Sequence, residues 1–194
     1  MNVAVNTLCP RLRTVSYVWC IIAILMTGHA AIANIKDAEP NISAIRKSLI
    51  SAVNSGKTTD SLYQQLEVMN NKTPLITGYM GTLQALKAKH SWNPYNKIKY
   101  IKNCEKTFQM AVHQDPHNIE IRFMRFSVEH NVPSFLGYNK NLGADKAEII
   151  RQLDKGFYAQ ADTQLVRTII KFLLDSKRCT AAETRNLNQH LAAL

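Results

Sequence analysis

Apolar side chains recur every three or four residues through most of this chain, and this periodicity limits its fold more than any other feature. A clear example follows Pro94, with apolar residues at Ile98, Ile101, Cys104, Phe108, Ala111 and Val112. Such spacing places apolar side chains on one face of an α-helix. No segment shows the sustained alternation expected of a half-buried β-strand. The sequence therefore predicts an all-α protein of about eight helices packed in antiparallel pairs.

Capping residues indicate where several of these helices begin. Thr73 stands directly before Pro74, so a cap is followed by proline at the first helical position. Asp60 is expected to cap an earlier helix, and Thr180 with Glu183 has the spacing of a capping box for the last one. The helix expected at about 119–130 is apolar on more than one face, so we expect it to lie centrally.

The N-terminal segment, residues 1–33, has the organisation of a secretory signal peptide. It contains no Asp or Glu, and Arg11 and Arg13 precede an apolar run at 15–26. The run is shorter than the roughly 20 residues of a membrane span, and it is followed by the small residues of Ala31-x-Ala33. We expect cleavage after Ala33, an exported single all-α domain at 34–194 without a transmembrane span, and a periplasmic or secreted location. An uncleaved amphipathic anchor is the alternative.

The charge balance of the chain is basic. Lys and Arg number 24 against 14 Asp and Glu, a formal net charge of +10. Export makes nucleic acid an unexpected partner, whereas an anionic component of the cell envelope, such as phospholipid headgroups, remains an option. We expect four lysines to lie in solvent on the outer side of one helix: Lys97, Lys99, Lys102 and Lys106.

Two cysteines, Cys104 and Cys179, lie after the predicted cleavage site. An oxidising compartment permits a disulfide between them. Both also stand at positions expected to be helical and partly buried, where a free thiol acts as a small apolar side chain. The sequence leaves both alternatives open.

One stretch is similar to a tetratricopeptide repeat. The residues that carry the likeness are Tyr95, Cys104, Phe108, Ala111 and Pro116. The resemblance covers about 92–129, and no second copy is visible one repeat length away. It implies a tetratricopeptide-like, right-handed helical array in which Tyr95 packs in the core. The segments 115–126 and 133–138 also resemble a family of small exported bacterial proteins without an assigned activity, which implies a fold and a location but no catalytic residues.

Charged residues occur within the apolar helix at about 119–130: Glu120, Arg122, Arg125 and Glu129. Buried charges need partners, so these residues form either a paired internal network, which we favour, or the lining of a pocket. Motifs for a phosphate loop, a serine nucleophile or a zinc protease are missing, so we expect no catalytic residues and no cofactor. A metal site at His113, Asp115, His117 and His130 is disfavoured because Pro116 interrupts their helical spacing.

The candidate binding residues are aromatic or apolar: Trp92, Tyr100, Phe135, Leu136 and Tyr138. The last three belong to a long connection at 131–143, where they either seal the core or bind a partner. We expect a non-catalytic helical binding module for a protein or peptide partner in the envelope. The alternatives are a small-molecule or lipid-binding protein, with or without enzymatic activity, that has a pocket around the Glu120–Glu129 helix, and a purely structural component.

Overall fold

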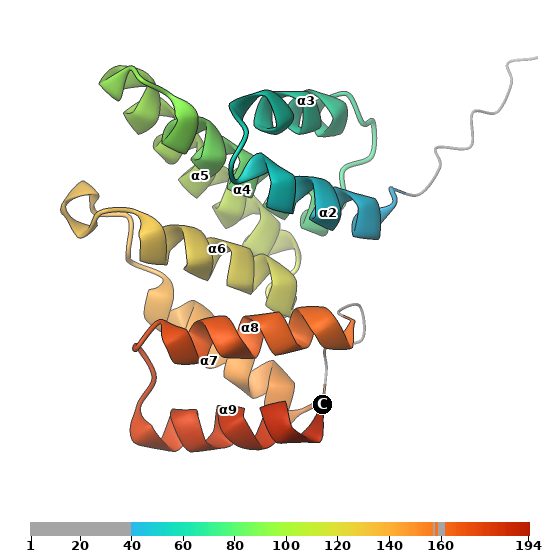
Figure 1. Cartoon of the computed structure of the whole chain (residues 1–194), viewed down its shortest axis with the longest axis vertical. Coiled ribbons are helices and arrows are strands. Elements are labelled where there is room, and N and C mark those ends of the chain that lie inside the picture. Colours follow the sequence, from blue (N-terminus) through green and yellow to red (C-terminus); the bar gives the residue numbers. More distant parts are fainter. Residues whose placement is uncertain (1–39, 157, 159–161) are drawn as a thin grey trace, which may run out of the picture. The chain divides into compact units, whose positions relative to one another are not determined.

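Eight α-helices and one short 3-10 helix make up the part of the chain that the structure describes, and that part contains no β-strand. The computed structural model describes residues 40–156, 158 and 162–194, so the predicted signal peptide lies outside it. In chain order (Figure 1) the elements are α2 (Ile42–Ala52), α3 (Gly56–Glu67), α4 (Pro74–His90), α5 (Pro94–Gln114), α6 (Ile119–Asn131), η1 (Ser134–Leu136), α7 (Leu142–Asp154), α8 (Thr163–Asp175) and α9 (Ala181–Ala193). The prediction of an all-α fold with eight helices is confirmed.

Helix starts follow the capping residues in most places. The Thr73 hydroxyl accepts a hydrogen bond from the backbone of Ile76 at 3.3 Å, and both bonds of the Thr180–Glu183 capping box are present. The expected cap at Asp60 is wrong. Ser55 caps α3 instead, because its hydroxyl accepts from the free N–H three residues later at 3.2 Å, so Asp60 falls inside the helix.

Consecutive helices pack pairwise and antiparallel, most extensively α4 with α5 and α6 with α7. Helices α4 and α5 approach closely at Gly81, where an added Cβ would lie 3.3 Å from the ring of Phe108. Helix α6 also packs on α4, beside Gly78. The tetratricopeptide-like arrangement expected for 92–129 stays a prediction.

Two clusters of buried apolar side chains stabilise these helices, and α6 contributes to both. Ile121 and Met124 join the first cluster, which is built from α2, α3, α4 and α5. Ile119 and Phe126 join the second, which is built with α7, α8 and α9. The central position expected for this helix is confirmed, and it explains why its apolar residues cover more than one face.

Candidate functional site

Four large apolar side chains are exposed near the α4–α5 connection and on η1. Trp92 lies in that connection and is 98% exposed, and Phe135 of η1 is 85% exposed. Tyr95 and Ile98, in the first two turns of α5, are 73% and 44% exposed. Single exposed apolar residues are common, but Trp92, Tyr95 and Ile98 lie within one short segment, and a group of exposed apolar residues is characteristic of an interaction surface.

The register of α5 explains which of its residues are exposed. Tyr95 precedes the buried Cys104 by nine residues, about two and a half turns, so the two side chains lie on opposite faces. Ile98 and Glu105 are seven residues apart and share one side of the helix. Lys140, just after η1, lies 3.8 Å from Glu105, so the segment after α6 meets α5 near Glu105, seven residues beyond Ile98.

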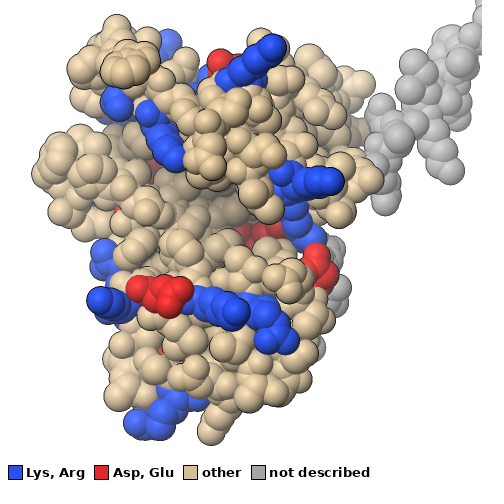
Figure 2. All heavy atoms as spheres, in the orientation of Figure 1, with Lys and Arg blue, Asp and Glu red and all other residues tan. Residues whose placement is uncertain are grey.

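Three exposed lysines lie on the same face of α5 as Tyr95. Lys99, Lys102 and Lys106 share the face of α5 that carries Tyr95, and Lys97 is exposed elsewhere on the same helix. The expectation that these four lysines lie in solvent is confirmed, and none forms an ion pair with a residue that the structure describes. Figure 2 shows basic side chains spread over the face in view, with acidic ones confined to a few places. We define the aromatic–basic surface as Trp92, Tyr95, Ile98, Lys99, Lys102, Lys106 and Phe135.

The structure separates the five binding residues suggested by the sequence. Trp92 and Phe135 are exposed, whereas Tyr100, Leu136 and Tyr138 are half-buried. The placement of Tyr95 in the core is wrong because its side chain points away from the face that packs on α4. The sequence signal that could have identified Tyr95 as exposed is its helical spacing from the buried residues of α5.

Glu120 is buried where α2, α4 and α6 meet. Arg46 donates to its two carboxylate oxygens at 2.8 and 2.6 Å, and the Tyr79 hydroxyl donates to one of them at 2.5 Å. A second arm of Arg46 reaches Asp162 at 2.9 Å. The carboxylate raises the pKa of Arg46 above its usual range, and burial beside Glu120 raises that of Tyr79.

The remaining charged groups of α6 also have hydrogen-bond partners. Asp145 of α7 is fully buried, accepts two hydrogen bonds from Arg125 at 2.7 and 2.6 Å, and accepts one from Arg122 at 2.8 Å. Glu129 accepts from the backbone and side chain of Asn141 at 2.8 and 2.6 Å. The expectation of a paired internal network is confirmed for Glu120, Arg122 and Arg125, whereas Glu129 is bound by the neutral Asn141 and lines the small hollow beside α6. The network joins α6 to its neighbours through hydrogen bonds to charged groups, which are the stronger kind.

The hollow beside α6 is small. It has a volume of about 20 Å³ and is lined by residues of α5, of α6 and of the segment after α6, with Tyr138 among them. Such a volume holds about one water molecule. Cys104 lies at this hollow, and burial raises the pKa of its thiol to about 12. This site offers no room for an organic ligand.

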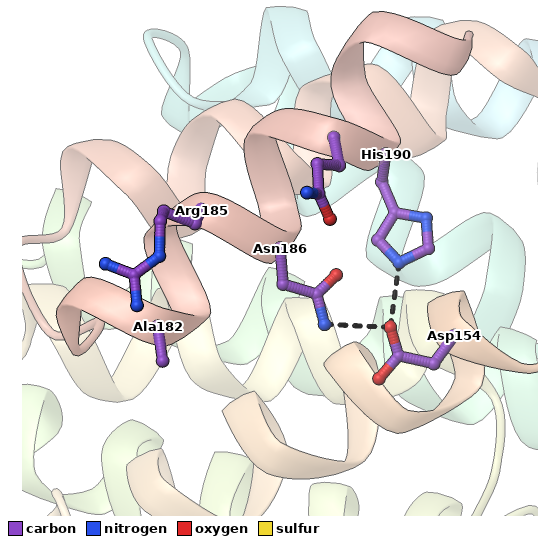
Figure 3. Close-up of a pocket in the computed structure, with 6 residues that line it drawn as sticks. Asp154, Ala182, Arg185, Asn186 and His190 are labelled. Atoms are coloured by element: carbon purple, nitrogen blue, oxygen red, sulfur yellow. Dashed lines mark hydrogen bonds and ion pairs between the residues drawn. The ribbon is translucent and has the colours of Figure 1, made fainter.

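A larger, open hollow of about 540 Å³ lies between α7 and α9 (Figure 3), and sequence analysis missed it. Asp154 accepts from Asn186 at 2.9 Å and contacts Nε2 of His190 at 2.8 Å. The bonds to His190 and Asn186 lower the pKa of Asp154. In Figure 3 the Arg185 side chain points away from Asp154 and His190. The carboxylate orients the imidazole, but the residues that line the hollow include no serine, threonine or cysteine nucleophile.

The histidines of the disfavoured metal site have other contacts. His117 bonds to Glu148 at 2.7 Å, and Nδ1 of His130 accepts a hydrogen bond from Arg178 at 3.0 Å. The structure brings no three potential metal ligands together within its described ranges.

Cys104 and Cys179 are free thiols in the structure. Cys104 belongs to the first apolar cluster and Cys179 packs against the second. The Cys179 thiol donates to the carbonyl of Leu173 at 3.5 Å.

Comparison of the chain with protein-family models, with curated proteins and with solved structures finds no match. Within the described ranges, no helix combines the length and apolar character needed to cross a membrane.

Proposed function

We propose that this protein is an exported, non-catalytic helical module that binds a partner in the cell envelope through the aromatic–basic surface. The observation that carries the proposal is the exposure of three aromatic side chains: Trp92 and Tyr95 at the α4–α5 connection, and Phe135 on η1. Aromatic side chains provide large contact areas and act as anchors at binding sites. Export is inferred from residues 1–33. A protein or peptide is the partner that the sequence favours, and an anionic envelope component is the other.

The competing function is a small-molecule or lipid site, with or without catalysis, around the Glu120–Glu129 helix. Ligand pockets usually enclose at least about 300 Å³. The hollow beside α6 has a volume of about 20 Å³, and the charged groups of this helix are paired with Arg46, Asp145 and Asn141. These observations favour the surface over the pocket.

The proposal is tested by binding the processed chain, residues 34–194, to envelope preparations and measuring the fraction retained. The Trp92→Ala, Phe135→Ala double variant is expected to lose about tenfold or more in retention, because it removes two aromatic anchors. Both side chains are exposed, so the variant is expected to fold normally.

The matched control is the Ile50→Ala, Val68→Ala double variant. These apolar side chains are 73% and 79% exposed and lie outside the aromatic–basic surface. The control is expected to bind like the unaltered chain. Equal retention of all three proteins, or no retention of any, would overturn the proposal.

A further inference from the structure

We infer that the aromatic–basic surface docks the protein on the headgroup region of an anionic lipid bilayer. The inference rests on the proposed function and names the partner of that surface. Three observations carry it: the charge of the sequence around the aromatic–basic surface, the type of basic residue on the surface, and the exposed positions of its aromatic residues.

The sequence around the surface contains no acidic residue over a long stretch. Residues 68–104 include six lysines and no Asp or Glu. The first acidic residue after this stretch, Glu105, is paired with Lys140. Lys87 of this stretch is paired with Asp60 at 3.1 Å, whereas Lys99, Lys102 and Lys106 form no ion pair with a residue that the structure describes. Clusters of unpaired lysines are attracted to anionic lipid surfaces.

The basic residues of this surface are all lysines. Interfaces between proteins are enriched in arginine and depleted in lysine at their centres, because an ammonium group is costly to strip of water. At a bilayer surface the lysine stem follows the apolar layer while its ammonium stays among the headgroups. A bilayer surface therefore suits Lys99, Lys102 and Lys106 better than the centre of a protein–protein interface does.

Two of the three aromatic residues, Trp92 and Phe135, lie at exposed turns. Trp92 occupies the three-residue connection between α4 and α5, and Phe135 occupies η1. Both turns lie at the left of the view in Figure 1, the first in green and the second in yellow-orange. Neither of the two hollows described above is lined by Trp92, Tyr95 or Phe135. Exposed tryptophan and tyrosine beside lysines are typical of membrane interfaces, whereas peptides more often bind in grooves.

Trp92 provides a direct spectroscopic probe. The chain has two tryptophans, and the other, Trp19, lies within the predicted signal peptide, so residues 34–194 contain Trp92 alone. The probes are vesicles with equal parts of phosphatidylglycerol and phosphatidylcholine, and vesicles of phosphatidylcholine only. We expect the anionic vesicles to cosediment with the chain and to shift the Trp92 emission to shorter wavelength, and the neutral vesicles to do neither.

Two variants separate the contributions of charge and apolar contact. Each lysine near an anionic surface contributes roughly fivefold, so the Lys99→Gln, Lys102→Gln, Lys106→Gln variant is expected to bind on the order of 100-fold more weakly. The matched control is Lys47→Gln, Lys155→Gln, Lys171→Gln, which removes the same charge from exposed sites elsewhere. The Tyr95→Ser, Phe135→Ser variant, which retains Trp92, is expected to weaken binding about tenfold or more.

The outcomes distinguish this inference from the proposed function. Equal weakening by the two lysine variants, or equal binding to neutral and anionic vesicles, would overturn it. If the chain ignores vesicles but is retained by a protein partner through Trp92 and Phe135, the bilayer inference fails and the binding module stands. If neither vesicle binding nor envelope retention depends on the aromatic–basic surface, the bilayer inference and the proposed function both fail.

Discussion

Arg46 of α2 binds the two carboxylate oxygens of Glu120 of α6 across 74 residues of sequence. Tyr79 of α4 completes the site, so one buried carboxylate joins three helices. Removing one partner of a buried ion pair leaves the other uncompensated, which is the costly change at such a site.

We therefore expect Glu120→Gln to lower the free energy of unfolding by about 2–4 kcal/mol, a value reduced because Arg46 is partly exposed. Urea unfolding followed by circular dichroism measures this change. Glu67→Gln, which alters an exposed carboxylate in α3, serves as control and should cost less than about 0.5 kcal/mol. A similar effect of both changes would contradict the role of Glu120.

Two glycines in helices are expected to respond oppositely to alanine. An added Cβ at Gly81 would lie 3.3 Å from the Phe108 ring, whereas one at Gly143 would meet nothing within 4 Å. Gly81→Ala should therefore destabilise the protein by about 1–3 kcal/mol through overpacking. Gly143→Ala should stabilise it by about 0.5–1 kcal/mol through helix propensity. Thermal unfolding of both variants tests the pair, and effects of the same sign would refute the packing described for α4 and α5.

The pKa of His130 in the folded protein is expected to lie below the ordinary value for histidine. Burial beside Phe126 and Phe172 lowers the pKa of its imidazole, and the positive charge of Arg178 lowers it further. The unfolded chain therefore binds the proton more readily, so this contribution to stability is present above about pH 6.5 and is lost as pH falls through the folded pKa. NMR titration of the histidines measures the shift. Arg178→Gln should raise the pKa of His130, and an unchanged value would exclude the contact with Arg178.

Cys104 and Cys179 are expected to react as separate free thiols. Iodoacetamide at about pH 8 should modify the half-buried Cys179 before Cys104, whose pKa of about 12 keeps it protonated. In urea both should react without a reductant, as peptide mass spectrometry will show. A pair that reacts only after reduction would restore the disulfide that the sequence left open.

The sequence alone determined the helical elements and most of their starts. Spacing of three and four, as in Ile101, Cys104 and Phe108, identifies a helix because it matches the period of the backbone itself. Caps such as Thr73 work through bonds to residues three positions away, so they too can be recognised locally. Ser55 was missed because both it and Asp60 are good caps, and only packing decides between them.

The tertiary structure decided which charged groups meet and which aromatic residues stay outside. Nothing near Glu120 in the sequence indicates that Arg46 is its partner, because that contact depends on how α2 approaches α6. Asp154 and His190 are likewise joined only by the packing of α7 and α9. Local spacing shows that Tyr95 lies opposite Cys104, but its exposure also requires that no other helix covers that face. Contacts between distant helices depend on side-chain packing throughout the fold, whereas helix formation depends mainly on neighbours along the chain.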